Sequence, residues 1–348
     1  MAKKIRVLVV DDSALVRNIL KSGLSMDPEI EVVDTAADPY QARDKILELE
    51  PDVLTLDVEM PRMDGVAFLR RLMPQYPIPV VMVSALTEKG KRITMEALEA
   101  GALDFVTKPA SGISRGLNAM MSDLIEKVKI ASVADVSHWQ NRTIEPPKTE
   151  TLPKVLSGST DKVIAIGAST GGTEAIRSMI KAFPASTPGI VIVQHMPPGF
   201  IAAFAESLDR QSAMNVKEAE NGDRVMPGRV LIAPGGKQMK VRRSGGIYQT
   251  KIYEGDKVNG HCPSVGVLMD SVAEYVGDNA IGVILTGMGS DGAEGLLAMR
   301  KAGARTFGQD EKSCVVYGMP KVAFEKGAVE KQVPIDKMVY NVLKVLES

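Results

Sequence analysis

Residues 162–176 read KVIAIGASTGGTEAI, so that a short apolar run, a glycine-rich corner and a helical pattern follow one another. Strand, corner and helix form the repeating unit of a parallel α/β sheet. The corner can serve two purposes. Its backbone N–H groups can bind a phosphate group, or it can present Ser169 as a nucleophile, because Gly167, Ser169 and Gly171 fit the pattern G-x-S-x-G.

The residues that follow the corner count against phosphate binding. A P-loop has Lys and then Ser or Thr after its last glycine, but Gly172 is followed by Thr173 and Glu174. A dinucleotide-binding loop begins Gly-x-Gly, and Ser169 stands where its second glycine belongs. Glu174 also places a negative charge in the first helical turn, where it would repel a phosphate. The sequence therefore favours a serine nucleophile, which needs an imidazole base and usually a carboxylate.

The chain has three histidines from which this base can come. His138 lies in a polar stretch that contains prolines, and His261 follows a polar β section. His195 instead ends the apolar run GIVIVQH at residues 189–195, which is typical of a buried strand. Side chains at the carboxyl ends of parallel strands meet at one edge of the sheet, so His195 is the better partner for Ser169.

A carboxylate for the same edge follows the apolar run at residues 281–285, where the turn TGMGSDG contains Asp291. Asp291 can orient the imidazole of His195, and it can also cap the helix that follows. The sequence therefore predicts a triad of Ser169, His195 and Asp291 that performs acyl transfer. The order Ser, His, Asp differs from the order Ser, Asp, His of α/β-hydrolases. We expect the amide of Met288, in the same turn, to stabilise an oxyanion.

Apolar runs alternate with helical patterns in two parts of the chain, which predicts two α/β domains that each contain a parallel sheet. Residues 132–161 between them are polar, contain three prolines and show no clear period. We assign residues 1–125 to the first domain, 126–160 to a linker and 161–348 to the second domain. A small β-hairpin is expected over residues 238–253. The expected strands are 5–10, 30–36, 52–57, 79–84 and 103–107, and then 162–168, 189–195, 228–236, 280–287 and 304–310.

The composition narrows the function classes. The formal net charge is -1, so no global field attracts nucleic acid or an anionic membrane. Arg242-Arg243 can form a local basic patch, but we favour a solvated strand end. No apolar run reaches the ~18 residues of a membrane span, and the N-terminus does not resemble a signal peptide. Cys262 and Cys314 fit no C-x-x-C spacing. We therefore expect a cytoplasmic protein that binds no nucleic acid and does not insert into a membrane.

Polar side chains also gather at the strand ends of the first domain. Asp11 and Asp12 follow its first strand, and Asp57 ends its third. Ser84 ends its fourth strand, and Lys108 follows its fifth. Carboxylates that meet at one edge repel one another, and a hard cation such as Mg²⁺ removes that repulsion. A carboxylate nucleophile, a metal, a lysine and a hydroxyl together can receive a phosphoryl group.

The stretches VVDDS, LDVEMPRMDG, VVMVSA and FVTKP make the first domain resemble the response-regulator receiver family. The resemblance implies a flavodoxin-like five-stranded sheet, with Asp57 as the phosphoacceptor and a histidine kinase as the phosphodonor. The metal ligands that it implies for Mg²⁺ are Asp11, Asp12, Asp57 and the carbonyl of Glu59. The residues that it implies for sensing the phosphoryl group are Ser84, Phe105 and Lys108.

The stretches IGASTGGTEAI, QHMPPGF, HCPSVGVL, GVILTGMGSDGA and SCVVYGMP make nearly the whole chain resemble the CheB family of chemotaxis protein-glutamate methylesterases. The resemblance implies hydrolysis of glutamate methyl esters on chemoreceptors, and deamidation of receptor glutamines, with the triad on Ser169, His195 and Asp291. We expect the second, doubly wound and mostly parallel domain to need no cofactor. The family more often has an arginine at the position of Cys262 and an aspartate at that of Gly266.

A phosphoacceptor joined to a hydrolase suggests a switch. The resemblance implies that the unphosphorylated receiver restricts access to the catalytic cleft, and that phosphorylation of Asp57 raises activity. The alternative function is a phosphorylation-controlled docking protein without catalysis. A nucleotide-binding enzyme that uses Gly167–Gly172 is a further alternative.

Overall fold

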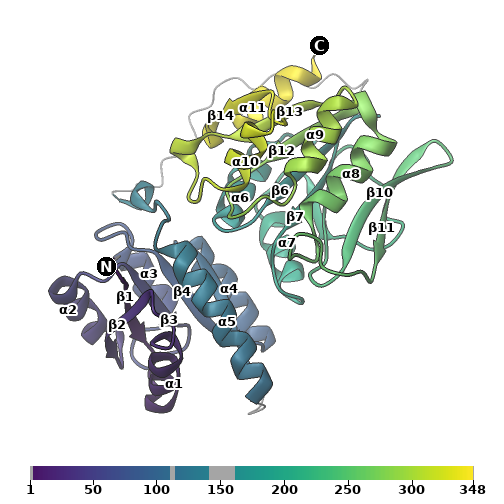
Figure 1. The fold of residues 1–348 in the computed structure, drawn as a ribbon. Helices are drawn as coiled ribbons and strands as arrows, with labels where there is room; N and C mark the ends of the chain where they lie inside the picture. Colours follow the sequence, from purple (N-terminus) through teal and green to yellow (C-terminus); the bar gives the residue numbers. More distant parts are fainter. Residues whose placement is uncertain (1–2, 110–113, 141–160, 348) are drawn as a thin grey trace. The chain divides into compact units, whose positions relative to one another are not determined.

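The structure is a computed structural model, and it describes residues 3–109, 114–140 and 161–347 of the 348. The chain divides into two compact units, Met1–Glu145 and Pro146–Ser348, and each is built around a parallel sheet (Figure 1). Residues 141–160, which make up most of the expected linker, lie outside the described part. None of the helices in the described part is long and apolar enough to cross a membrane.

The first unit contains a five-stranded sheet in the order β2-β1-β3-β4-β5, with every neighbouring pair parallel. This order is that of the flavodoxin-like fold and confirms the predicted fold class. The strands are β1 (Ile5–Val10), β2 (Ile30–Ala36), β3 (Val53–Asp57), β4 (Val80–Ala85) and β5 (Asp104–Lys108). The helices are α1 (Ala14–Leu24), α2 (Pro39–Leu49), α3 (Gly65–Leu72), α4 (Glu88–Glu99) and α5 (Ser114–Ala131).

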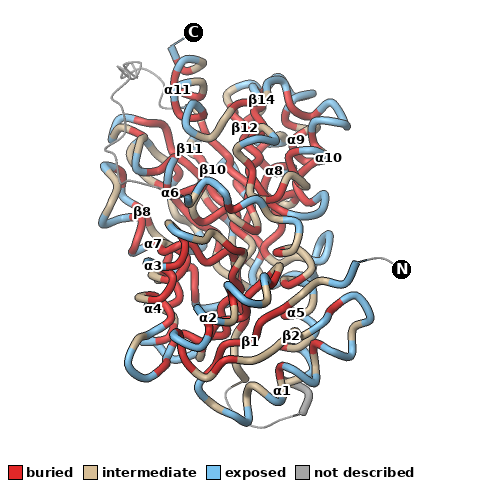
Figure 2. Tube along the Cα trace, turned by 90° about the vertical axis from the view of Figure 1, so that its left-hand side faces the viewer, coloured by how far each residue is buried: buried red, intermediate tan, exposed pale blue. Residues whose placement is uncertain are grey.

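Local sequence accounts for the ends of these helices. The side chains of Ser13, Asp38 and Asp64 each accept a hydrogen bond from a backbone N–H in the first turn of the helix that follows. The apolar period predicts a start of α4 near Ile93, but Thr87 caps the helix, so that it begins at Glu88. The central strands β1, β3 and β4 are mostly buried and the edge strands β2 and β5 only in part, whereas the helices are buried on one side only (Figure 2).

A short 3₁₀ helix, η1 (Ser137–Trp139), follows α5. The ring of Trp139 packs onto the first unit, because its atoms lie 3.2 Å from the position that a Cβ on Gly101 would take. This contact attaches the first part of the expected linker to the first unit.

The second unit contains a seven-stranded sheet in the order β14-β13-β12-β6-β7-β9-β8, again with parallel neighbours. Its strands are β6 (Val163–Ala168), β7 (Gly189–Gln194), β8 (Asn215–Glu218), β9 (Arg229–Ile232), β12 (Ala280–Ile284), β13 (Arg305–Gln309) and β14 (Lys331–Val333). Its helices are α6 (Gly172–Ala182), α7 (Ile201–Asp209), α8 (Val265–Tyr275), η2 (Gly277–Asn279), α9 (Ala293–Lys301), η3 (Glu311–Ser313), α10 (Met319–Glu325) and α11 (Ile335–Leu346). The expected hairpin is present as β10 (Gln238–Ser244) and β11 (Ile247–Tyr253).

The register of the central strands brings the predicted triad to one edge. Ala168 at the end of β6 pairs with Gln194 at the end of β7, so the next residues along the chain are Ser169 and His195. β12 pairs with the other side of β6 and leads into the loop that contains Asp291. The fold therefore places three neighbouring strand ends where the sequence predicts a site.

The close contact between β6 and α8 generates a first prediction. A Cβ on Gly167 would lie 2.1 Å from Cγ1 of the fully buried Val265. We expect Gly167→Ala to lower the free energy of unfolding by about 1–3 kcal/mol, because the packed side chain of Val265 or the helix that carries it must move. Urea unfolding of the full chain measures this change. In a double-mutant cycle with Val265→Ala the two costs should be far from additive, and an unchanged Gly167→Ala stability would contradict the packing argument.

Candidate catalytic and phosphoacceptor sites

An acidic cluster lies at the carboxyl edge of the first sheet. Carboxylate oxygens of Asp11, Asp12 and Asp57 all lie within 4.8 Å of one another, and Glu59 lines the same cavity as Asp12 and Asp57. The ammonium of Lys108 reaches Asp57 Oδ1 at 2.9 Å and Asp11 Oδ2 at 3.0 Å. The donors are oxygen atoms of hard carboxylates around an open cavity, a set that fits a divalent cation such as Mg²⁺.

The charge of Lys108 alone does not balance the three carboxylates of this cluster. Burial raises the pKa of Asp57 to about 6; Lys108 opposes the rise and Asp11 adds to it. Burial disfavours the charged form of Lys108 as well, but Asp57 and Asp11 more than compensate and raise the pKa of this lysine. The cluster thus combines a partly desolvated carboxylate with a fixed cation beside it, which suits a phosphoacceptor.

The residues expected to sense a phosphoryl group differ in their surroundings. Ser84 is buried, and its hydroxyl lies 2.6 Å from Thr94 Oγ1, which in turn donates to the carbonyl of Gly90. The hydroxyl of Ser84 is therefore engaged by α4. Phe105 is also buried, beneath the ammonium of Lys127. Of the expected sensing residues, Lys108 is the one that contacts Asp57.

The glycine-rich corner of the second unit holds Ser169 by its backbone. Ser169 N–H donates to the carbonyl of Thr286 at 3.0 Å, and its own carbonyl accepts from Gly172 N–H at 2.8 Å. Gln194 Nε2 donates to the carbonyls of both Ser169, at 2.9 Å, and His195, at 3.1 Å. The Gly172 N–H at the start of α6 already donates to the carbonyl of Ser169, so it is not free to bind a phosphate group. Gln194 connects the backbones of the predicted nucleophile and base.

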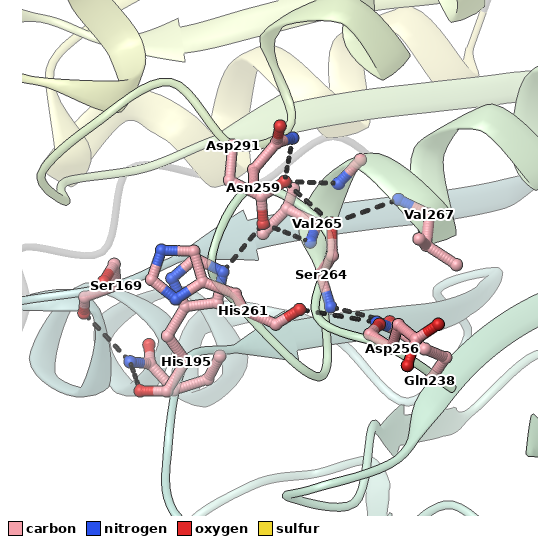
Figure 3. A network of polar contacts seen from close by, with 12 residues as sticks. Ser169, His195, Gln238, Asp256, Asn259, His261, Ser264, Val265, Val267 and Asp291 are labelled. Carbon is pink, nitrogen blue, oxygen red and sulfur yellow. Dashed lines mark hydrogen bonds and ion pairs between the residues drawn. The ribbon is translucent and has the colours of Figure 1, made fainter. Parts of the chain in front are cut away.

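Asp291 is buried and pairs with the partly buried His195, whose Nε2 lies 2.9 Å from Asp291 Oδ2. Figure 3 shows the imidazole between Ser169 and Asp291. In the part of the chain that the structure describes, no hydrogen bond joins the Ser169 hydroxyl to this ring, although the two residues follow paired strand ends. Catalytic hydrogen bonds of this type are often long until substrate binds.

The carboxylate of Asp291 is surrounded by hydrogen-bond donors. Its two oxygens accept from His195 Nε2, Asn259 Nδ2, Ser264 Oγ and the N–H groups of Val265 and Gly266. The last two donors belong to the start of α8, whereas the cap of α9 is Gly292. Asp291 therefore caps a helix, but one that precedes it in the sequence instead of the one that follows. The positive end of α8 adds to its stabilisation.

These contacts determine the protonation of the pair. Burial alone would raise the pKa of Asp291, but the hydrogen bonds from His195, Asn259 and Ser264 hold it well below its usual range. A charged carboxylate only accepts hydrogen bonds, so Nε2 of His195 carries the proton. In the neutral ring Nδ1 is then the basic nitrogen, and this atom is buried without a hydrogen-bond partner in the described residues.

A second imidazole covers the first. The rings of His195 and His261 are stacked, with centroids 3.6 Å apart and an angle of 10° between their planes (Figure 3). His261 ends a tight turn in which Val258 and His261 exchange both backbone hydrogen bonds around Asn259 and Gly260. Both turn residues have positive φ angles, of 52° and 83°. One turn thus supplies a ring to His195 and an amide to Asp291.

The loop after β12 packs directly against Ser169. A Cβ on Gly287 would lie 2.6 Å from Cβ of Ser169, so only glycine allows this approach. The carbonyl of Gly287 accepts from the N–H groups of Gly318 and Met319, which holds the loop in place. The N–H of Met288 has no acceptor among the described residues, and the residue is 47% exposed. Met288 is therefore available for a substrate.

Four residues that contact the triad were missed or set aside in the sequence analysis: Gln194, Asn259, His261 and Ser264. Asn259-Gly260 is the dipeptide of a two-residue hairpin turn, and Ser264 precedes a helical pattern, so local signals for both exist. Neither signal reveals that the turn lies on Asp291. Gln194 has no sequence signal at all, because only the pairing of β6 with β7 brings its amide to Ser169.

The departure from the family pattern at residue 266 has a clear geometry. Gly266 N–H donates to Asp291 Oδ1 at 3.1 Å, and a Cβ on Gly266 would lie 3.2 Å from the same oxygen. An aspartate here would place its side chain beside a charged carboxylate, whereas glycine leaves Asp291 with donors alone. Cys262 contacts the carbonyl of Gly255 and touches none of the triad residues in a described hydrogen bond.

A receiver-type fold with an acidic cluster, joined to a second α/β unit with a serine–histidine–aspartate arrangement, defines the class of a hydrolase fused to a phosphoacceptor domain. Comparison with known protein families supports this class. The model of the CheB methylesterase family matches residues 164–342, and that of the response regulator receiver domain matches residues 7–120. The chain belongs to the CheB methylesterase family.

Individual relatives match the whole chain. A protein-glutamate methylesterase/protein-glutamine glutaminase of Syntrophotalea carbinolica is 67% identical over 99% of both chains. A protein of the same name from Salmonella typhimurium is 53% identical over 98% of this chain and 96% of its own. The crystal structure of the Thermotoga maritima CheB methylesterase catalytic domain is similar with a TM-score of 0.52 and 38% identity, covering 53% of this chain and 98% of that one. These similarities do not favour the alternative of a non-catalytic docking protein.

The stacked histidine generates a pH prediction. Burial and then His195 lower the pKa of His261 to about 4 from 6.5. In the unfolded chain His261 binds a proton below pH ~6.5, whereas in the folded chain it binds one only below pH ~4. The free energy of unfolding therefore falls as the pH falls through this window. We expect His261→Phe to remove this part of the fall in urea unfolding between pH 7 and 4.5. The exposed His138, changed to Phe, is the matched control, and identical slopes for both variants would contradict the prediction.

Proposed function

We propose that this chain is a phosphorylation-controlled serine hydrolase that removes methyl groups from glutamate methyl esters on chemoreceptors and deamidates receptor glutamines. The observation that carries the proposal is the His195–Asp291 pair beside the Ser169 corner, in a chain similar over its full length to methylesterase/glutaminases. We assign receiver, linker and hydrolase to residues 1–125, 126–160 and 161–348, and place the enzyme in the cytoplasm.

The chemistry follows from the protonation of His195. Nδ1 takes the Ser169 proton while Oγ attacks the ester carbonyl, and the charge that appears on the ring is stabilised by Asp291 through Nε2. The carbonyl oxygen becomes an oxyanion, for which the Met288 N–H is the candidate donor. Collapse returns the proton to the leaving methoxide, so that methanol departs and an acyl ester forms on Ser169.

The second half of the reaction repeats these steps with water. His195 takes a proton from water, the hydroxide attacks the acyl ester, and Ser169 leaves with that proton, so glutamate is released. A glutamine side chain enters the same route with ammonia as the leaving group. One acyl-enzyme intermediate thus accounts for both activities, and the hydrolase needs no cofactor.

In the receiver, we propose Asp57 as the phosphoacceptor and a chemotaxis histidine kinase as the donor. Asp11, Asp12, Asp57 and the carbonyl of Glu59 would hold Mg²⁺, which neutralises the charge on the transferred group. Lys108 contributes a fixed charge next to Asp57. Ser84 would have to turn away from Thr94 to reach a phosphoryl oxygen, and with Phe105 it would report the phosphorylated state to the rest of the unit.

Methanol release from methylated receptor membranes tests the activity. We expect Ser169→Ala to lower the rate by up to ~10⁶-fold, because the nucleophile of such a unit is lost. Ser186→Ala, which removes an exposed hydroxyl from the same unit, is the control and should retain the wild-type rate. Equal release by Ser169→Ala and the wild type, with both variants folded, would sink the serine mechanism.

Truncation tests the control by phosphorylation. We expect residues 161–348 alone to be more active than the unphosphorylated full chain, by the ~5–150-fold that couplings of ~1–3 kcal/mol produce. A small-molecule phosphoryl donor should raise the activity of the full chain in a Mg²⁺-dependent manner and leave Asp57→Asn unchanged. A folded fragment that is less active than the unphosphorylated chain would show that the receiver does not inhibit.

A further inference from the structure

The β10–β11 hairpin extends from the second unit next to α8 (Figure 1). One of its faces is buried: Met239, Val241 and Tyr248 belong to the core that also contains residues of α8. The Val241 N–H donates to Ser271 Oγ of α8 at 2.9 Å, which fixes the hairpin in position. Side chains alternate between the two faces of a strand, so the neighbours of these residues point the other way.

The outward face is basic. In the register of the hairpin, Lys240 is opposite Lys251, and Arg242 is opposite Gln249. Arg224 forms an antiparallel bridge with Gln249 from the other side, which puts its side chain on the same face. The cations Lys240, Lys251, Arg242 and Arg224 are all exposed and occupy two adjacent rows of one surface, which we call the basic face.

The basic face is neutralised only in part by the described residues, because Lys240 acts on the carboxylate of Asp270 in α8. In the described residues none of its four cations forms an ion pair, whereas the neighbouring acids Glu254 and Asp223 are paired with Lys237 and Lys217. Lys240 and Lys251 both lie near the ring of Tyr253, at 5.7 and 5.9 Å. Like charges directly opposite in a sheet are destabilising, so this arrangement works against the stability of the hairpin.

We propose that the basic face binds an acidic polypeptide segment of the protein substrate. The inference rests on the proposed function, since a protein that carries glutamates and their methyl esters is an acidic partner. The formal net charge of the whole chain is -1, so the attraction comes from this surface and not from a global field. The function of the face is to hold the substrate while Ser169 reaches one ester after another.

The spacing of the cations suits a helical partner. Lys240 and Arg242 are two residues apart on one strand, or about 6.6 Å, and glutamates four residues apart on a helix rise by about 6 Å. A membrane surface fits less well, because proteins that lie on membranes combine cations with inserted apolar groups. None of the large exposed apolar side chains of the described residues is in the hairpin.

The reaction changes the strength of this contact. Each hydrolysis converts a neutral ester into a carboxylate, so the substrate becomes more acidic with every turnover. The basic face therefore binds a demethylated segment more tightly than a methylated one, and this favours repeated action on one substrate molecule at low salt.

The first test is binding of a synthetic glutamate-rich helical peptide to the full chain, measured by fluorescence anisotropy. We expect the variant K240Q/R242Q/K251Q to bind about tenfold more weakly than the wild type, and the wild-type affinity to fall as salt rises. K181Q/K337Q/K344Q also removes three exposed positive charges, from α6 and α11, and should bind like the wild type. Equal binding by all three proteins overturns the proposal. So does wild-type binding to phosphatidylglycerol vesicles with no binding to the peptide.

The second test separates this proposal from the proposed function. With methylated receptor as substrate, K240Q/R242Q/K251Q should show a KM raised about tenfold with kcat unchanged, and a small methyl ester should be hydrolysed at the wild-type rate. A wild type that releases no methanol refutes the proposed function, while the peptide assay still decides whether the basic face binds acidic segments. If the wild type is active and its KM matches that of the variant, the proposed role of the basic face in substrate binding is refuted.

Discussion

The catalytic unit depends on keeping one buried charge, the carboxylate of Asp291. Taking a carboxylate out of water costs on the order of several kcal/mol, and here hydrogen bonds and the positive end of α8 offset that cost. The donors come from the 258–261 turn, the start of α8 and the end of β7, so the same contacts that stabilise the charge assemble the site. The charged state of Asp291 in turn leaves Nδ1 of His195 as the basic nitrogen.

The receiver also contains a buried carboxylate, that of Asp57, but its charge is only partly compensated. Asp57 is buried beside Asp11, and a single ammonium, that of Lys108, is shared between them. Its charge is insufficient, and the pKa of Asp57 remains raised, to about 6. A site that is undercompensated in this manner gains from a divalent cation, whereas the fully compensated Asp291 does not. The two carboxylate sites of the chain are therefore suited to different chemistry, one to receiving a phosphoryl group and one to orienting an imidazole.

Much of the fold could be predicted because parallel strands buried on both faces are continuous apolar runs. β1 and β2 begin and end where these runs do, and β6, β7 and β12 differ by a few residues at one end. The edge strands β8 and β14 were not predicted, since they have four and three residues and are only partly buried. The predicted start of α4 was also wrong, because the Thr87 cap extends the helix beyond its apolar period.

The sequence by itself determined the alternation of strands and helices, the strand-end positions of the acidic cluster, and the choice of Ser169, His195 and Asp291 as candidates. These depend on local patterns, which are complete within a few residues. Only the tertiary structure decided that Asp291 caps α8, that Gln194 connects Ser169 to His195, and that His261 covers the imidazole. Each of these contacts joins segments far apart in the chain, and their geometry comes from the order β12-β6-β7 and the register of the strands, which no local pattern contains.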